Sequence, residues 1–353
     1  MSLSDHRKAI DQLDAQIVKL LNERTEHVLK IGEIKLKAGE EIYAPHREKQ
    51  VFQRVCKQNS GPIKNDSLCA IYREIMSSAL SLEKSMTIAY LGPEATFTHQ
   101  AAIQRFGSSL KYAAQRTIGE VFTEVGRKRA DYGVVPVENS TEGVVTHTLD
   151  MFVDSDLKIV AQIVLPIQHC LVGREGLGEI RKIYVHPQTL AQCRGWLLKN
   201  QPNAELIETS SNARSAELAK KEKHAAAIAG VLAAEKYGLR ILHADIQDNS
   251  SNATRFLVLG RQCSPATGQD RTSIMLSLAD EVGALHRALA SFRRYKINMT
   301  KIESRPSKRK AWEYFFFVDC DGHMTDRKVA RALADLEREC NFVKVLGSYP
   351  NSE

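Results

Sequence analysis

Basic side chains at helical spacing are the first residues whose types and positions could do chemistry. Arg24 and Lys35 are eleven residues apart in a segment with helical apolar periodicity, which corresponds to three turns plus about 20°. They share one face, about 16 Å apart along the axis, and could hold a small dianion between them. Arg7 precedes Arg24 by seventeen residues, about 25 Å and about 100° away. It could reach the same ligand only from a second copy of the helix; the alternative is a set of solvated surface charges.

A cluster of small polar residues after an apolar run is a second candidate for a ligand-binding site. The apolar run Gly133–Val137 is followed by Asn139–Thr141, and a periodic segment begins near Val144. This order predicts a buried strand that leads into a helix N-terminus, where free backbone N–H groups and the helix dipole favour an anion. A capping box between Asn139 and Glu142 is the simpler interpretation, and the segment alone does not decide between the two.

Helical segments are expected to position the basic residues. Apolar periodicity predicts helices over residues 5–37, 45–58 and 66–84. The first would be roughly 50 Å long, too long to bury its apolar stripe against two shorter neighbours. It is therefore expected to pair with another copy of itself, which predicts a homodimer and leaves a higher oligomer open.

The middle of the chain alternates strands with helices. The order strand, turn, helix is expected at 87–106, 133–152 and 182–199. A fourth turn, followed by a helix, is expected at 208–221. This alternation predicts parallel sheets in two lobes around a cleft, with crossing strands near 160–168 and 240–250. Thr254 stands just before the last predicted strand, 255–260, where a threonine is usually only a turn or strand residue.

The last eighty or so residues show the order β-α-β-β-α-β. Strands are expected at 273–278, 299–303, 312–318 and 342–346, and helices at 283–295 and 326–340. This order predicts an α+β, ferredoxin-like fold, in which the isolated His286 and His323 are expected on the surface rather than as ligands. The chain is therefore expected to be multidomain, with an all-α domain over 1–86, an α/β domain over 87–265 and an α+β domain over 270–353.

Composition limits the classes of function. The 353 residues are 43% hydrophobic and 26% charged, with a net charge of +7. No apolar run reaches the roughly 18 residues of a membrane span, and the N-terminus lacks the apolar core of a signal peptide, so a cytoplasmic location is expected. Seven scattered cysteines argue for reduced thiols and against a zinc site, and no metal or cofactor is expected. The basic runs 127–129 and 308–310 are short and lack aromatic neighbours, so no nucleic acid is expected.

Motifs in the first segment resemble the all-helical chorismate mutase domain. They are Arg7…Asp14, Leu20–Arg24, Ile31–Lys35 and Pro45–Glu48. The resemblance covers nearly all of residues 5–84 and implies an intertwined dimer whose pocket takes one arginine from the neighbouring chain. The residues that would line this pocket, by position, are Arg7, Arg24, Lys35, Arg47 and Glu48.

The implied reaction is the rearrangement of chorismate to prephenate. It needs no nucleophile, so catalysis means holding the compact conformer and stabilising charge on the breaking ether oxygen. Arginines would hold the carboxylates and Lys35 would donate to the ether oxygen. The chain differs from some members of the chorismate mutase family at two positions. It has Ala44 where they have an aspartate, and Glu83 where they have a glutamine. Glu83 could assist catalysis only when protonated, because an ionised carboxylate would repel the developing charge; otherwise it is a solvated residue of the last turn.

Motifs in the middle segment resemble prephenate dehydratase. They are Gly92–Phe97, Val135–Gly143 and Thr254–Phe256. The resemblance implies a two-lobed, periplasmic-binding-protein-like fold that converts prephenate into phenylpyruvate with loss of carbon dioxide and water. Thr254 would relay or orient a proton for the departing hydroxyl, with Glu138 as an alternative acid. The residues expected to bind the carboxylates are Asn139, Ser140 and Thr141, with Ser211 and Asn212 contributing from the opposite lobe.

Two motifs in the last segment resemble the phenylalanine-binding motifs of ACT domains. The residues expected to bind this effector are Gly283, Ala284, Leu285, His286, Glu303, Ser304, Arg305 and Pro306. Phenylalanine bound there would favour a less competent dehydratase, although a dimerisation module without ligand is an alternative. From end to end the chain thus resembles the bifunctional chorismate mutase–prephenate dehydratase family. Two other interpretations compete with this one: an amino-acid-sensing transcription regulator, and a dehydratase with a helical dimerisation domain.

Overall fold

The computed structural model describes residues 2–39, 41–174, 178–307 and 313–351. The chain packs as two compact units. The first unit consists of Met1–Thr87 together with Arg105–Lys111, and the second consists of Ile88–Gln104 together with Tyr112–Glu353. The predicted basic run 308–310 and the start of the strand predicted at 312 lie outside the described residues. No helix in the described ranges is long and apolar enough to span a membrane.

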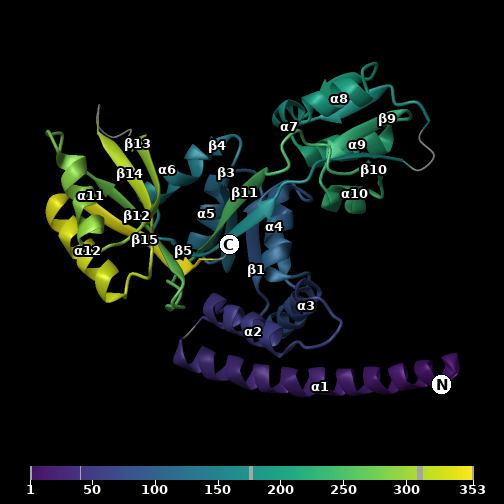
Figure 1. Cartoon of the computed structure of the whole chain (residues 1–353), viewed down its shortest axis with the longest axis horizontal. Helices are drawn as coiled ribbons and strands as arrows, with labels where there is room; N and C mark the ends of the chain where they lie inside the picture. Colours follow the sequence, from purple (N-terminus) through teal and green to yellow (C-terminus); the bar gives the residue numbers. More distant parts are fainter. Residues whose placement is uncertain (1, 40, 175–177, 308–312, 352–353) are drawn as a thin grey trace. The chain divides into compact units, whose positions relative to one another are not determined.

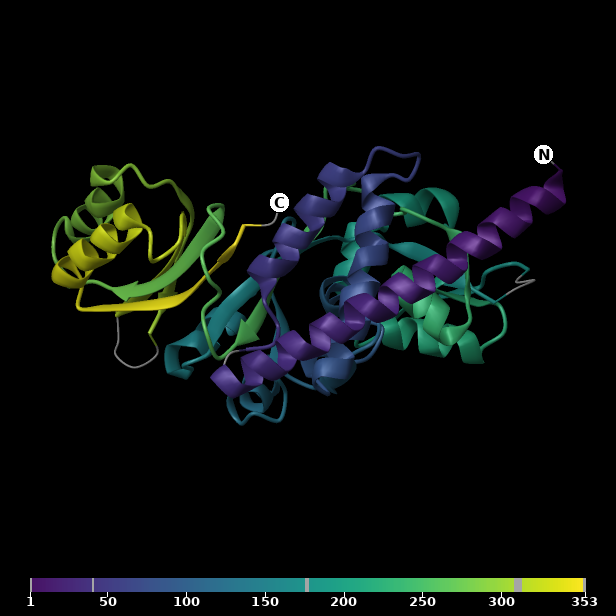
Figure 2. The same ribbon diagram turned by 90° about the horizontal axis from the view of Figure 1, so that it is seen from below.

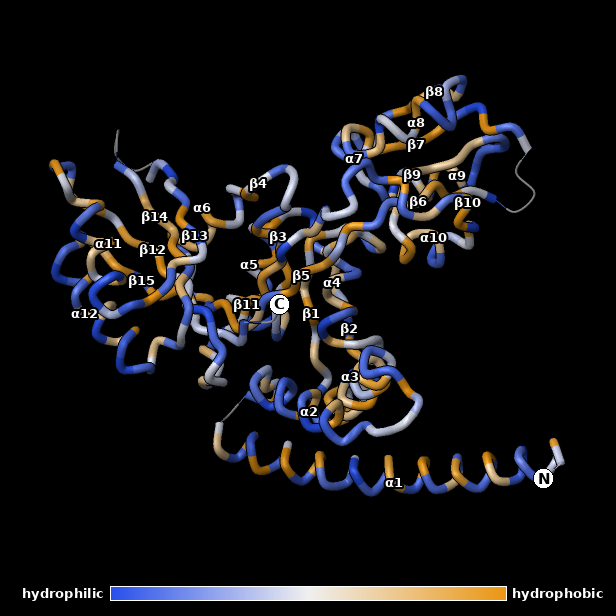
Figure 3. Tube along the Cα trace, viewed as in Figure 1, coloured by the Kyte–Doolittle hydropathy of each residue, from blue (hydrophilic) through white to orange (hydrophobic). Residues whose placement is uncertain are grey.

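The first unit is helical, as predicted. Its helices are α1 (Leu3–Ala38), α2 (Pro45–Gln58) and α3 (Asn65–Glu83), each within two residues of its predicted bounds. Ser2 caps α1 in a capping box with Asp5, and Gly39 ends it in the left-handed conformation. Gly32 is the buried residue of α1, whereas its apolar positions recur along the helix and are exposed (Figure 3). These exposed positions are Ile10, Leu13, Ile17, Leu20, Ile31 and Ile34.

The second unit opens with a lobe built on one mixed sheet. Its strands are β1 (Thr87–Leu91), β2 (Lys111–Gln115), β3 (Tyr132–Asn139), β4 (Gly143–Val144), β5 (Lys158–Pro166) and β11 (Ala253–Gly260). The order is β2-β1-β3-β11-β5, with β4 beside β3. Helices α4 (Phe97–Phe106), α5 (Ile118–Gly126) and α6 (Thr146–Asp154) connect them.

A second lobe is formed by the central part of the chain (Figure 1). Its strands are β6 (Cys170–Gly173), β7 (Lys182–Val185), β8 (Glu205–Glu208), β9 (Ala225–Ala229) and β10 (Arg240–His243), in the order β10-β6-β9-β7-β8. Its helices are α7 (Pro187–Gln192), α8 (Arg194–Asn200), α9 (Asn212–Lys221) and α10 (Val231–Tyr237). The prediction of parallel sheets is wrong in part. β1–β3 and β7–β9 are parallel, but β11 and β6 run antiparallel to their neighbours, because the chain crosses between lobes and returns in the opposite direction.

The C-terminal segment follows the predicted element order. It comprises β12 (Asp270–Ser277), α11 (Ala284–Arg294), β13 (Met299–Pro306), β14 (Tyr314–Asp321), α12 (Arg327–Glu339) and β15 (Phe342–Pro350). The sheet order is β13-β14-β12-β15, and the paired strands are antiparallel. Figure 2 shows α11 and α12 together against this sheet. His323 was expected on the surface and that prediction is wrong: it is 3% exposed and Nε2 lies 2.9 Å from the carbonyl of Ser264.

The two faces of the C-terminal sheet have different neighbours. Ile274 and Leu276 pack with the helices in one core, while Met275 shares a second core with the first lobe, as the two-residue period of a strand requires. β15 approaches β5 so closely that a Cβ on Gly347 would lie 2.2 Å from the carbonyl of Ile159. The C-terminal sheet and the first lobe therefore pack as one body.

Candidate active sites

Charged residues of α1 meet the end of α3 in the helical unit. Burial raises the pKa of the Glu83 carboxyl, and the positive charges of Lys35 and Arg24 oppose this rise, so the three groups lie within electrostatic reach. Lys35 Nζ donates to the carbonyl of Ile42 at 2.9 Å. Nη1 of Arg24 is buried and has no hydrogen-bond partner among the described residues. A buried donor without an acceptor is costly, and an anionic ligand would supply the acceptor.

His46 is a neighbour that the sequence analysis did not single out. Burial, and then the charges of Lys35 and Arg47, lower the pKa of its imidazole, and Nδ1 is buried with no partner in the described part of the chain. Its place directly before Arg47, in the motif that opens α2, was the available signal. The guanidinium of Arg47 is exposed and donates to Gln50 at 3.2 Å.

Glu48 and Arg7 are not part of this cluster. The Glu48 carboxylate is buried, lies 2.8 Å from Arg105 Nη2 and 3.5 Å from the Tyr43 hydroxyl. Burial raises the pKa of Glu48, and Arg105 and Arg73 oppose the rise. Arg7 is exposed near the start of α1. Substrate binding by Glu48 and by Arg7 stays a prediction.

Gly32 determines where the Glu83 carboxylate can lie. A Cβ at position 32 would be 2.6 Å from Glu83 Oε2, well inside van der Waals contact. We expect Gly32→Ala to lower the kcat of the predicted mutase by roughly 10- to 100-fold, because Glu83 is a predicted catalytic residue and a displacement of about 1 Å in such a group can cost about 100-fold. Stability should not fall, since alanine favours a helix over glycine by about 1 kcal/mol and a flexible side chain can move aside.

Steady-state kinetics and thermal melting of the purified variant check this expectation. Gly61→Ala is the matched control, because the nearest atom to its new Cβ is 4.0 Å away. A Gly32→Ala enzyme with the wild-type mutase rate would show that the close approach to Glu83 is without consequence.

In the second unit, Asn139 and Thr254 are direct partners across neighbouring strands. Asn139 ends β3, Thr254 lies at the start of β11, and the two are paired in register. Asn139 Nδ2 donates to Thr254 Oγ1 at 2.8 Å. Because the threonine oxygen accepts this bond, its own O–H can donate to a ligand. The sequence places these residues 115 positions apart, and the sheet joins them.

The turn after Asn139 differs from the prediction. The chain forms a hairpin: β4 pairs back onto β3, and α6 starts only at Thr146. Asn139 Oδ1 accepts the N–H groups of Thr141 and Glu142, both at 3.0 Å. The predicted helix N-terminus and capping box are therefore wrong at this position, because the amide closes a turn instead. Glu142 Oε1 accepts from Gln192 at 3.2 Å.

Asn252 completes the group around Asn139. It is 3% exposed, and its Oδ1 lies 2.9 Å from Asn139 Nδ2 and 3.4 Å from Thr141 Oγ1. Its Nδ2 donates to Gln192 of α7, in the other lobe, at 3.0 Å. Neither Asn252 nor Gln192 was among the residues predicted from the sequence; the two-residue spacing of Asn252 from Thr254 was the available signal.

Other predicted dehydratase residues have structural partners. Ser140 Oγ accepts from the N–H of Ala253 at 2.9 Å and so closes the β3–β11 ladder. Ser211 caps α9, and Asn212 Oδ1 accepts from Thr189 at 2.8 Å. The structure thus brings Asn139, Thr141, Asn252 and Thr254 together, while the hydrogen bonds of Ser211 and Asn212 are local to the second lobe.

Predicted effector residues lie at one end of α11 and along β13. Gly283 precedes α11 with φ +82°, a left-handed conformation that favours glycine. Ala284 is buried and His286 is exposed. Arg305 donates through Nε and Nη2 to both carboxylate oxygens of Asp150 in α6, each at 3.2 Å. Effector binding by these residues stays a prediction.

Comparison with known proteins follows the same three divisions of the chain. Family models match as chorismate mutase type II over residues 6–84, prephenate dehydratase over 88–264 and ACT domain over 272–338. A bifunctional chorismate mutase/prephenate dehydratase of Aquifex aeolicus (strain VF5) is 50% identical over 99% of this chain and 98% of its own. The chain belongs to this bifunctional family. A second member, from Neisseria gonorrhoeae, is 45% identical over 99% of this chain and 97% of its own.

A solved structure supports the fold of the second unit. Prephenate dehydratase from Arthrobacter aurescens, in complex with L-Phe, aligns with a TM-score of 0.70 at 36% identity, covering 75% of this chain and 90% of its own. Because the bifunctional relatives match from end to end, the helical unit is a mutase domain. The end-to-end match supports the bifunctional interpretation over the two competing ones.

Proposed function

We propose that the helical unit binds chorismate through Arg24 and Lys35 and that Lys35 and Glu83 stabilise the breaking ether oxygen. The buried, unpartnered Nη1 of Arg24 supports this assignment. Arg47 and Glu48 are the further pocket residues of the proposal. The protein supplies position and charge, and it needs no nucleophile and no cofactor.

A homodimer is part of this proposal. The exposed apolar positions of α1 form a long stripe of a kind that soluble proteins normally cover. Arg7 lies on the same helix, about 25 Å from Arg24. A second copy of α1 would cover the stripe and bring its own Arg7 to the site.

Protonation of Glu83 makes the mutase reaction pH-dependent. Burial raises the pKa of its carboxyl, and only the protonated form donates a hydrogen bond. Mutase activity is therefore full below the Glu83 pKa and falls as the pH rises through it. Glu83→Gln removes the titration and should flatten the profile of kcat against pH. A variant whose profile still follows that of the wild type would exclude this role.

The Asn139–Thr254 pair is the observation that carries the dehydratase assignment. Asn139 donates to the threonine oxygen at 2.8 Å, which leaves the hydroxyl hydrogen available to donate to the departing hydroxyl of prephenate. Loss of carbon dioxide and aromatisation drive that departure. The residues proposed to bind the carboxylates of prephenate are Thr141 and Asn252, together with Ser140, Ser211 and Asn212. A threonine is a weak acid, so Thr254 orients or relays the proton rather than supplying it alone.

Regulation by phenylalanine through residues 283–286 and 303–306 is also proposed. The ACT match and the L-Phe complex of the Arthrobacter aurescens dehydratase support it. The element order of 270–353 supports a ferredoxin-like fold, and the two sheets joined by two crossing segments support a periplasmic-binding-protein-like fold. The family matches support domain boundaries at 1–86, 87–265 and 270–353. A cytoplasmic location stays a prediction.

The direct experiment supplies chorismate to the purified chain, with and without phenylalanine. Chorismate should disappear, phenylpyruvate should form, and phenylalanine should slow the second process. Prephenate that accumulates without conversion would exclude the dehydratase assignment, and stable chorismate would exclude the mutase assignment.

A further inference from the structure

Arg255 and Glu138 are motif residues that the proposed chemistry does not use. They follow Thr254 and precede Asn139, and they pair with each other across β11 and β3. Successive residues of a strand point to opposite faces, so Arg255 is directed away from the Thr254 side. The register shifts by one residue between Arg255 and Phe256. Such a bulge redirects side chains, here bringing Glu138 to the face of Arg255.

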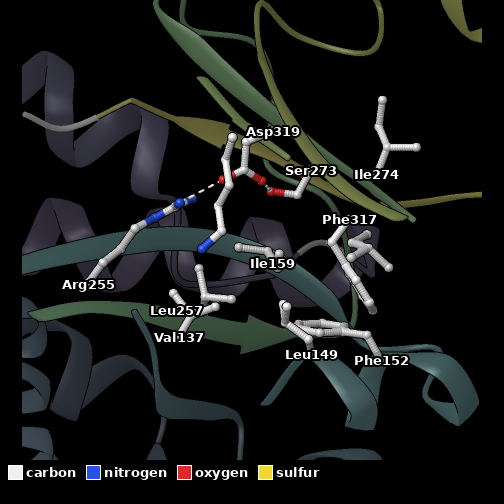
Figure 4. Close-up of a pocket in the computed structure, with 12 residues that line it drawn as sticks. Val137, Leu149, Phe152, Ile159, Arg255, Leu257, Ser273, Ile274, Phe317 and Asp319 are labelled. Carbon is white, nitrogen blue, oxygen red and sulfur yellow. Dashed lines mark hydrogen bonds and ion pairs between the residues drawn. The ribbon is translucent and has the colours of Figure 1, made fainter. Parts of the chain in front are cut away.

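The guanidinium of Arg255 is held by partners from the C-terminal segment. Nη1 lies 2.6 Å from Asp319 Oδ2 and Nη2 lies 2.8 Å from the Tyr349 hydroxyl, while Nε donates to Gln162 of β5 at 3.0 Å. Figure 4 shows Arg255 directed at Asp319, which Ser273 also contacts. The Arg255 side chain is 13% exposed. Each of its three nitrogens has a partner, so these contacts hold the guanidinium in place.

Glu138 is held from the same segment by a second ion pair. Lys301 Nζ of β13 lies 2.8 Å from Glu138 Oε2, and the lysine side chain is 13% exposed. This contact favours a structural role for Glu138 over the alternative of a proton donor. Arg305, four residues along β13 on the same face, pairs with Asp150 of α6. The C-terminal sheet thus contacts both strands of the site and the helix that follows its hairpin.

The space between these ion pairs is not a ligand site. The cavity lined by Arg255, Lys301 and Asp319 together with apolar side chains such as Val137 and Phe152 (Figure 4) has a volume of about 20 Å³. That is room for about one water molecule, too little for an amino acid or for prephenate. The surrounding core is shared between the first lobe and the C-terminal sheet, so the ion pairs join two bodies that already pack tightly.

We propose that Arg255 and Glu138 are positioning residues of the dehydratase. Through Asp319 and Lys301, the C-terminal sheet holds the ends of β11 and β3 so that Asn139 and Thr254 keep their hydrogen bond. The inference rests on the proposed role of that pair.

The test uses Asp319→Asn and Lys301→Met in the full-length chain. Each should lower the dehydratase kcat about tenfold, as expected for a small displacement of the reacting group, with the KM for prephenate within about twofold. The mutase rate should not change. Asp321→Asn is the control on the same strand, because its carboxylate accepts from Asn298 instead, and both rates should stay at wild-type values. The melting temperature and the mutase rate of each variant show whether it is folded. If loss of the buried Asp319 charge impairs folding, Lys301→Met alone provides the test.

A double-mutant cycle separates positioning from general damage. In an Asn139→Ala background the effect of Asp319→Asn should shrink to less than about twofold, because the contact it positions is already lost. A full tenfold effect in that background, or unchanged kcat in both anchor variants, would overturn the proposal. Failure of the proposed function itself looks different: Asn139→Ala and Thr254→Ala would then keep full dehydratase activity.

Discussion

Replacing Thr254 with alanine lowers the dehydratase kcat by roughly 10³-fold, the middle of the range for loss of a positioned proton-transfer group. The hydroxyl oxygen accepts from Asn139 Nδ2 at 2.8 Å, which leaves its hydrogen to be donated, and alanine has no such group. The mutase rate of the same variant stays at the wild-type value, because the proposed mutase residues Arg24, Lys35 and Glu83 belong to the other unit. Stopped assays of phenylpyruvate and chorismate measure the two rates.

Thr254→Ser is the matched control for this variant. Serine keeps the oxygen that accepts from Asn139 and the hydrogen that can be donated, so most of the dehydratase rate should return. An alanine variant that is as active as the serine variant would remove Thr254 from the chemistry. Equal loss of mutase and dehydratase in the alanine variant would instead indicate damage to the whole chain.

Replacing Lys35 with methionine lowers the mutase kcat by about 10²- to 10³-fold, the usual effect of removing one donor that stabilises developing charge. Methionine keeps most of the length and apolar stem of lysine but has no positive charge. The lysine now donates to the carbonyl of Ile42, so its Nζ is already held at the end of α1. Dehydratase activity on added prephenate should be unchanged.

Lys37→Met is the control for charge alone, because it makes the same change two residues along the exposed part of α1. A similar loss in both variants would point to a general electrostatic effect on substrate capture. The expected split is a large fall in kcat for Lys35→Met and none for Lys37→Met.

The helices were predictable because their signals are local. The bounds of α1, α2 and α3 follow from apolar periodicity and from breaks at Gly39 and at residues 59–62. The shared face of Arg24 and Lys35 follows from helix geometry alone. The burial of Gly32 against Glu83 could not be derived in this way, because it depends on how α1 and α3 pack.

The segment after Asn139 shows where local signals fail. A small-residue cluster after a strand is compatible with a helix cap and with a hairpin turn. The structure has the hairpin, because the two-residue strand β4 pairs with β3. The side-chain nitrogen of Asn139 donates to Asn252 and Thr254, which are more than 110 residues away. The family motifs identified Thr254, but they did not reveal that Arg255 faces the C-terminal sheet, since that depends on a bulge and on contacts from residues 301, 319 and 349.

The central claim is that one chain carries two separable sites, and a mixing experiment tests it most directly. Thr254→Ala alone should convert chorismate only to prephenate, and Lys35→Met alone should form phenylpyruvate from chorismate at a rate lowered by about 10²-fold or more. An equal mixture of the two variants should form phenylpyruvate at about half the wild-type rate, since each supplies the step that the other lacks. A mixture no faster than Lys35→Met alone would contradict the account.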